Sequence, residues 1–174
     1  MLGRSVETTM VLVGLGSNLG TSSGIIQRAI VALRIFSCGE VRASEMWRTS
    51  PVDCPPGSAD FVNAVAAFEP KQDLTASKLL DGLKRLEREF GRDEALVKNA
   101  PRMLDLDLLI FGELKINEAD LVIPHPRAQE RRFVLAPAAE IVPDLIWPGT
   151  QCTIGALLES LVSDEVVQQI EIAE

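Results

Sequence analysis

The sequence contains no tyrosine and a single histidine, and its 17 lysine and arginine residues are outnumbered by 25 aspartate and glutamate residues. The formal net charge of −8 argues against a nucleic-acid-binding surface, which would carry an excess of basic residues. The sequence also lacks an aromatic motif of the kind that stacks RNA bases. We therefore expect no nucleic-acid partner. The net charge does not exclude a local cluster of basic residues.

Cysteine and long apolar runs are also scarce. Cys38, Cys54 and Cys152 are odd in number and widely spaced, which fits neither a disulfide framework nor a zinc site and indicates a reducing compartment. No apolar stretch approaches the roughly 18 residues of a membrane span. The stretch Met10–Leu15 is too short for the core of a secretory signal. We therefore expect a cytoplasmic protein with no membrane partner.

The length of 174 residues, of which 47% are hydrophobic, is that of one domain with a proper core. The chain shows no internal repeat, low-complexity tract or linker. We expect residues 1–9 to be a flexible N-terminal extension and residues 10–174 to form a single domain.

The order of the expected elements indicates the fold class. Apolar periodicity and turn residues predict strands at 10–15, 41–48, 61–68 and 104–111, helices at 25–33, 79–90, 135–140 and 154–161, and a hairpin through 112–116. Two successive strand–helix–strand units predict an α+β fold of the ferredoxin-like, split βαβ type, with helices packed on a mainly antiparallel sheet. A doubly wound parallel fold is the alternative. The loop joining 41–48 to 61–68 favours the antiparallel arrangement.

Two carboxylates interrupt the last of these strands. The apolar run 104–111 is bounded by Pro101 and Gly112 and is too short for a helix. Because strand side chains alternate, Asp105 and Asp107 share one face, while Leu104, Leu106 and Leu108 face the core. Two like charges on one face repel each other, so this face should bind a cation. Mg²⁺ favours carboxylate oxygens and usually binds together with substrate phosphates.

A basic segment directly precedes this strand. Arg88, Arg92, Lys98 and Arg102 lie on the preceding helix end and loop. Cations next to metal-binding carboxylates are explained by a polyphosphate placed between them, neutralised by metal on one side and by guanidinium groups on the other. Each arginine taken alone is more simply explained as a solvated surface charge, but the loop as a unit, next to Asp-x-Asp, favours phosphate binding.

The glycine-rich stretch 14–20 does not match a dinucleotide fingerprint, because Leu19 occupies the place of the third glycine, and there is no phosphate-binding Walker motif. We interpret it as a tight turn from strand to helix, with Asn18 adopting unusual backbone geometry. A backbone contact to a ligand beside the helix N-terminus is the alternative.

Three further side chains are candidates for ligand contacts. Phe61 and Asn63 share a strand face, where an aromatic ring and an amide could stack on and hydrogen-bond a flat heterocycle. The alternative is that Phe61 is core and Asn63 caps the sheet. His125 lies between Pro124 and Pro126, which stiffens its loop and suits a ligand contact, although a structural role is equally consistent.

The segment 98–109, Lys-Asn-Ala-Pro-Arg-Met-Leu-Asp-Leu-Asp-Leu-Leu, resembles the signature of the 6-hydroxymethyl-7,8-dihydropterin pyrophosphokinases. Further segments similar to that family occur in the family's order at 14–20, 47–51, 60–64, 90–92, 123–126 and 131–135. Together they cover roughly residues 10–160.

This resemblance implies a ferredoxin-like fold and ATP-dependent pyrophosphoryl transfer in folate biosynthesis, with ATP and the pterin as partners, two Mg²⁺ ions and no obligate protein partner. The pterin hydroxymethyl oxygen would attack the β-phosphorus of ATP and release AMP. Carried over to this chain, the resemblance implies catalytic roles for Arg92, Arg102, Asp105 and Asp107, metal binding by Asp105 and Asp107, ATP binding by Glu87, Arg92, Lys98, Arg102, His125 and Arg131, and pterin binding by Thr49, Val52, Phe61, Asn63 and Phe133.

The chain departs from the family pattern mainly in the loop before the acidic strand. Glu94 replaces a common arginine and Asn99 a common tryptophan, while Lys84 and Pro126 replace a glutamine and a tyrosine. If loop closure completes the site, we expect a different closure or slower turnover. The alternatives are another two-metal nucleotidyl or nucleotide-sugar transferase on a ferredoxin-like sheet, and a non-catalytic binding module. The pair Phe61 and Asn63, together with the Arg-x-x-Asp-x-Asp spacing, favours the pterin enzyme.

Overall fold

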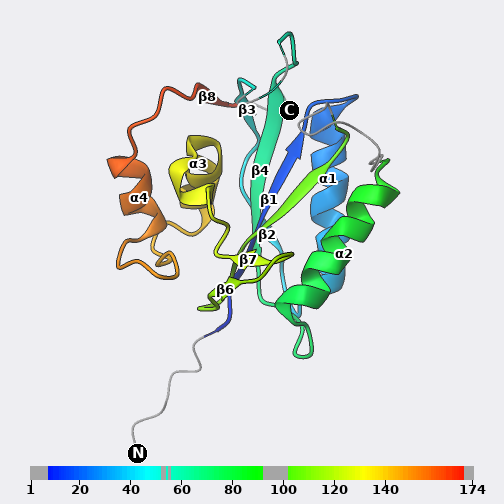
Figure 1. The fold of residues 1–174 in the computed structure, drawn as a ribbon. Coiled ribbons are helices and arrows are strands. Elements are labelled where there is room, and N and C mark those ends of the chain that lie inside the picture. Colours follow the sequence, from blue (N-terminus) through cyan, green and yellow to red (C-terminus); the bar gives the residue numbers. More distant parts are fainter. Residues whose placement is uncertain (1–7, 52–53, 55, 92–101, 171–174) are drawn as a thin grey trace, which may run out of the picture.

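The structure is a computed structural model that describes residues 8–51, 54, 56–91 and 102–170 (Figure 1). Its regular elements are β1 (Val11–Ser17), α1 (Ser22–Leu33), β2 (Arg42–Ala43), β3 (Trp47–Thr49), β4 (Phe61–Phe68), α2 (Ala76–Glu89), β5 (Asp105–Phe111), β6 (Ile116–Asn117), β7 (Val122–Ile123), α3 (Arg132–Ile141), α4 (Ile154–Ser160) and β8 (Val167–Gln169). Short 3₁₀ turns follow α1 and precede α3.

The main sheet has the strand order β5-β1-β4-β3-β8, with β2 also pairing with β4, and its neighbouring strands are antiparallel. Two crossovers, β1-α1-β3 and β4-α2-β5, build this order, and both place their helix on the same face of the sheet (Figure 1). The predicted ferredoxin-like split βαβ fold is therefore confirmed. No helix among the described ranges is long and apolar enough to cross a membrane.

The two faces of the sheet are covered unequally. On one face α1 and α2 cover the sheet and bury alternate strand residues such as Val13, Leu15 and Leu106. On the other face α3, with α4 beyond it, packs on Leu12 and Val65. Helices α3 and α4 cover one end of this face, and they leave the strand positions at its other end uncovered.

Local sequence signals explain the predicted helix before the acidic strand. Leu79, Leu83 and Leu86 form the buried stripe of α2. The Thr75 hydroxyl caps the helix by accepting a hydrogen bond from the Lys78 N–H at 3.3 Å. Gly91 follows the helix with φ +92°, a left-handed conformation that favours glycine at this position.

The prediction of one strand at 41–48 was wrong in detail, because the segment forms the two short strands β2 and β3. The Ser44 N–H donates to the Val65 carbonyl at 2.9 Å, but the Val65 N–H donates to the Ser44 hydroxyl at 3.0 Å. A side chain thus replaces a backbone carbonyl, and the ladder is interrupted there.

The predicted hairpin through 112–116 was also wrong. Gly112 makes a turn with φ +53°, and its N–H donates to the carbonyl of Met10. The chain then leaves the main sheet, and Ile116 pairs with Ile123 in the separate two-stranded sheet β6-β7.

Candidate active site

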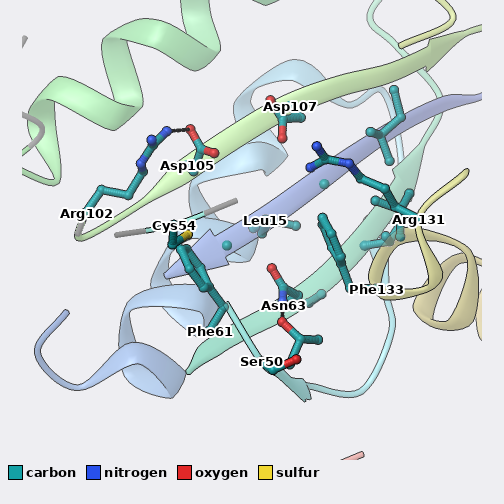
Figure 2. Close-up of a pocket in the computed structure, with 17 residues that line it drawn as sticks. Leu15, Ser50, Cys54, Phe61, Asn63, Arg102, Asp105, Asp107, Arg131 and Phe133 are labelled. Atoms are coloured by element: carbon teal, nitrogen blue, oxygen red, sulfur yellow. Dashed lines mark hydrogen bonds and ion pairs between the residues drawn. The ribbon is translucent and has the colours of Figure 1, made fainter. Parts of the chain in front are cut away.

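A cleft lies on the sheet face that α3 leaves open (Figure 2). Its floor comes from neighbouring positions of β1, β4 and β5, and its wall comes from the start of α3 and from the segment after β3. The lining residues are Gly14, Leu15, Gly16, Thr49, Ser50, Cys54, Phe61, Asn63, Ala64, Val65, Arg102, Asp105, Asp107, Leu109, Arg131, Phe133 and Val134. The cleft is therefore acidic at β5 and carries aromatic and amide groups at β4.

Glycines form the middle of the floor. Gly14 and Gly16 belong to β1, where they pair with Asp107 and Asp105 on β5. A Cβ atom at Gly16 would lie 3.0 Å from Oδ1 of Asn63, which is tighter than most contacts of this kind. The interpretation of 14–20 as a turn was therefore partly wrong, because the strand continues to Ser17 and the missing side chains leave room for the cleft.

The acidic pair has the predicted arrangement. Asp105 and Asp107 face the cleft, while Leu106 between them is 5% exposed in the opposite core. Desolvation, then the charges of Asp105 and Glu87, raise the pKa of Asp107 to about 7, against the weaker effects of Arg102 and Arg131. The Asp107 side chain keeps solvent access at the cleft, so a cation can reach it.

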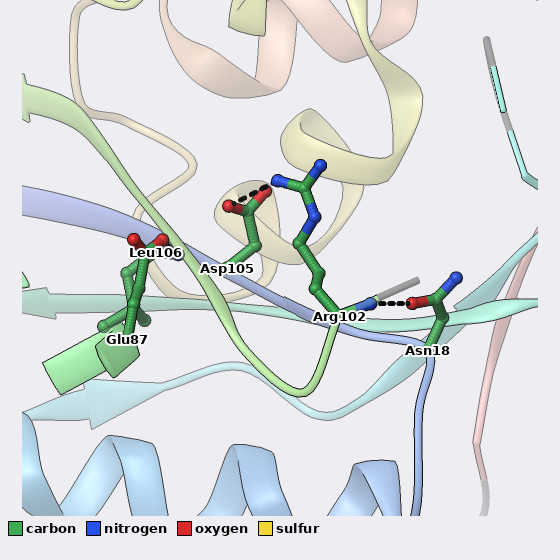
Figure 3. A network of polar contacts seen from close by, with 5 residues as sticks. All are labelled: Asn18, Glu87, Arg102, Asp105 and Leu106. Carbon is green, nitrogen blue, oxygen red and sulfur yellow. Dashed lines mark hydrogen bonds and ion pairs between the residues drawn. The ribbon is translucent and has the colours of Figure 1, made fainter. Parts of the chain in front are cut away.

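Arg102 is held in place beside Asp105 (Figure 3). Its Nη1 donates to Oδ1 of Asp105 at 2.9 Å. Its backbone N–H donates to Oδ1 of Asn18 at 2.9 Å, and its carbonyl accepts from the Asn18 N–H at 3.2 Å. Asn18 therefore clamps Arg102, three residues before the acidic strand begins, and this role was not predicted.

Glu87 supports the acidic strand from α2. Its side chain is 3% exposed, and Oε1 accepts a hydrogen bond from the Leu106 N–H at 2.8 Å (Figure 3). Glu87 is not among the residues that line the cleft. The observed contact orients β5, and the predicted contact with ATP stays a prediction.

The other end of the cleft contains the predicted groups for a flat ring. Phe61 and Phe133 lie on either side of Asn63 (Figure 2). Nδ2 of Asn63 donates to Oγ1 of Thr49 at 2.7 Å, which fixes the amide plane and leaves Oδ1 toward the floor. The Arg131 guanidinium lies 5.3 Å from the centre of the Phe133 ring.

His125 lies beside the cleft but outside its lining. The backbone N–H of His125 donates to the Leu109 carbonyl at 2.9 Å. The ring Nδ1 of His125 accepts from the backbone N–H of Arg127 at 3.3 Å, so the proton of the neutral ring lies on Nε2. Burial, followed by the charges of Arg131 and Arg127, lowers the pKa of His125. The neutral imidazole can therefore act toward a phosphate as an N–H donor.

The cleft brings together most of the described residues that were predicted for the site. These are Thr49, Phe61, Asn63, Arg102, Asp105, Asp107, Arg131 and Phe133. Val52, Arg92 and Lys98 lie outside the described residues, as do the unusual Glu94 and Asn99. Sequence reasoning missed the lining residues Ser50 and Cys54, for which the Pro-rich loop gave no specific signal.

The donor set fits a hard divalent cation that completes its coordination with substrate. Asp105 and Asp107 offer carboxylate oxygens on one strand face, and their mutual repulsion is relieved by a cation. Within the described part of the chain, no group of three or more metal-ligating side chains is gathered.

Comparison with known proteins agrees with this geometry. The chain is 39% identical over 150 residues to the 2-amino-4-hydroxy-6-hydroxymethyldihydropteridine pyrophosphokinase of Synechocystis sp., covering 86% of this chain and 75% of that protein. It is 40% identical over 139 residues to the enzyme of the same name from Pseudomonas aeruginosa, covering 79% and 83%. The chain spans only 28% of a folate synthesis bifunctional protein from Arabidopsis thaliana, to which it is 37% identical over 79% of its own length.

Solved structures show the same fold. A crystal structure of HPPK-DHPS in complex with substrates matches 88% of this chain and 43% of the solved chain, with a TM-score of 0.67 and 13% identity. The wild-type HPPK-DHPS of Plasmodium falciparum with pteroate matches 91% and 43%, with a TM-score of 0.66 and 14% identity. The model of one family, 7,8-dihydro-6-hydroxymethylpterin-pyrophosphokinase, matches residues 12–143. The chain therefore belongs to the 7,8-dihydro-6-hydroxymethylpterin-pyrophosphokinase family.

Proposed function

We infer that this chain transfers the pyrophosphoryl group of ATP to the hydroxymethyl oxygen of 6-hydroxymethyl-7,8-dihydropterin, a step of folate biosynthesis. Family membership supports this activity. The structural observation that carries the inference is that one cleft contains both an acidic pair with arginines and an aromatic-amide site. The family relationship does not favour the alternative of a nucleotidyl or nucleotide-sugar transferase.

The two ends of the cleft would bind different substrates. Asn63 would pair with the edge of the pterin, while Phe61 and Phe133 stack on its faces. Arg102 and Arg131 would bind the triphosphate, with His125 as a neutral donor beside them. This places the hydroxymethyl group toward the acidic strand, where the phosphates would lie.

The reaction is a displacement at phosphorus. The hydroxymethyl oxygen forms a bond to the β-phosphorus, the bond from that phosphorus to the bridging α,β-oxygen breaks, AMP leaves, and the alcohol loses its proton. Such a transfer requires alignment and charge neutralisation more than covalent chemistry from the protein. The side chains of the cleft supply these two contributions.

We propose that Asp105 and Asp107 hold two Mg²⁺ ions against the triphosphate, which would supply charge neutralisation on the side opposite the arginines. Arg102 is paired with Asp105 in the structure. With both the metal and the nucleotide bound, Asp105 would hold the metal and Arg102 would bind the phosphates. Removal of divalent ions with a chelator should therefore abolish turnover.

We also propose that the enzyme acts in the cytoplasm without an obligate protein partner. The support is that Cys38, Cys54 and Cys152 form no disulfide, and that the relatives from Synechocystis and Pseudomonas are not bifunctional by name.

Product analysis tests the proposed function directly. Purified protein with ATP, Mg²⁺ and 6-hydroxymethyl-7,8-dihydropterin should form AMP and the pterin diphosphate in equal amounts, as measured by mass spectrometry. ADP with a pterin monophosphate, or no conversion of the pterin, would contradict the proposal. Asp107→Asn, which removes a metal-binding carboxylate oxygen, should lose turnover while the protein remains folded.

A further inference from the structure

The C-terminal segment, residues 161–170, lies along the pterin end of the site although the family match ends at residue 143. Its strand β8 pairs with β3 at the sheet edge, where Val167 is opposite Thr49. The carbonyl of Val166 accepts from the Ser50 N–H at 3.4 Å, and the Ile170 N–H donates to the Met46 carbonyl at 2.7 Å. Figure 1 shows this segment running from α4 past α3 to the sheet edge.

The same segment is tied to the start of α3. Oε2 of Glu165 accepts a hydrogen bond from the backbone N–H of Phe133 at 3.3 Å. Nη2 of Arg132 donates to the Leu161 carbonyl at 3.1 Å, and the Glu165 N–H donates to the Ser163 hydroxyl at 3.1 Å. Glu165 is thus held on both sides, by its own loop and by the helix.

The start of α3 needs such a partner. Its N-cap residue, Arg131, makes no side-chain cap bond, and its first turn contains no acidic residue. The first N–H groups of a helix have no partner within the helix and favour negative charge. Glu165, which follows Phe133 by 32 residues, supplies both the acceptor and the charge.

We propose that Glu165 is a positioning residue for the pterin site, acting through Phe133. This inference rests on the proposed function. Glu165 fixes the backbone of Phe133, whose ring lines the cleft, while β8 fixes Thr49, whose hydroxyl accepts from Nδ2 of Asn63. The C-terminal segment therefore holds two parts of the pterin site in register with each other.

Kinetics of point variants test the proposal. Glu165→Ala should raise KM for the pterin and its Kd in calorimetry about threefold to tenfold, the size expected when one partly exposed charge-assisted hydrogen bond is lost. KM for ATP should rise less than KM for the pterin, because the lost contact orients Phe133 directly and reaches the triphosphate only through Arg131, which packs on the Phe133 ring. Glu165→Gln keeps an acceptor oxygen and should recover most of the pterin affinity. Glu159→Gln, an exposed glutamate on α4, is the matched control and should behave as wild type.

Three outcomes would overturn the proposal: an unchanged pterin KM in Glu165→Ala, an equal rise of both KM values, or a Glu165→Gln variant as impaired as Glu165→Ala. Amide exchange at Phe133 gives a readout that requires no substrate, and it should be faster in Glu165→Ala than in wild type. If the wild-type protein fails to convert the pterin, the proposed function fails. Unchanged exchange at Phe133 instead contradicts the positioning role.

Discussion

Raising the pH should strengthen metal binding at the acidic pair through the titration of Asp107. Its pKa of about 7 lies far above the ordinary value of 3.8, because partial desolvation of the carboxylate in the cleft and the charges of Asp105 and Glu87 disfavour its charged form. Metal binding requires the ionised carboxylate. With this pKa, roughly one tenth of the group is ionised at about pH 6 and nine tenths at about pH 8, so the apparent affinity should rise about tenfold.

Calorimetric titration with Mn²⁺ alone, in buffers of different ionisation enthalpy, measures this effect. Mn²⁺ shares the carboxylate preference of Mg²⁺, and leaving ATP out avoids the titration of its terminal phosphate. About one proton should be released per bound metal at about pH 6, and close to none at about pH 8. The same titration of Asp107→Asn is the control, because any pH dependence of metal affinity that remains in this variant comes from other groups, such as His125. An affinity that is constant across this range in the wild type would refute the reasoning, since a carboxylate with an ordinary pKa is fully ionised throughout.

Three further predictions concern the same site. Asp107→Asn should raise the thermal midpoint of the metal-free protein at about pH 8. The pKa of Asp107 is higher in the folded than in the unfolded protein, so its ionised form destabilises the fold at pH values above the unfolded pKa, and asparagine removes this cost. A lower midpoint in scanning calorimetry would contradict this. Gly16→Ala should weaken pterin binding in calorimetry about tenfold, because its Cβ would lie 3.0 Å from Asn63 Oδ1. Gly14→Ala, with nearest atoms at 3.6 Å, should weaken it less, and equal effects would be evidence against this explanation. Asn18→Ala should lower the free energy of unfolding by roughly 1–2 kcal/mol through loss of a buried acceptor, measured by urea denaturation, and should reduce kcat by releasing Arg102; unchanged values of both would show that the clamp is dispensable.

The acidic strand was predictable from the sequence because its information is local. Alternation of leucine and aspartate gives both the strand and the face on which each side chain lies, and the structure agrees for Asp105, Asp107 and Leu106. The order of strands and helices predicts the fold for the same reason. The family resemblance then assigned roles to Thr49 and Phe133 that spacing alone did not indicate.

The remaining features depend on contacts between distant segments. From the sequence, Gly14 and Gly16 were interpreted as part of a turn. A glycine within a strand is explained by the neighbour that needs its space, which for Gly16 is Asn63, and that neighbour is known only from the structure. Strand β8 is short and polar, so it has no apolar period to reveal it. The clamp between Asn18 and Arg102 joins residues 84 positions apart and has no local signature.

Strand β5 forms one edge of the main sheet, and edge strands can recruit strands from other molecules. The Glu87 carboxylate accepts a hydrogen bond from the Leu106 N–H, and the backbone N–H of His125 donates to the Leu109 carbonyl. Two backbone groups that could pair with a foreign strand are thereby engaged within the molecule. The contacts that orient the acidic strand thus also oppose aggregation along the sheet edge, so resistance to aggregation and substrate geometry depend on the same atoms.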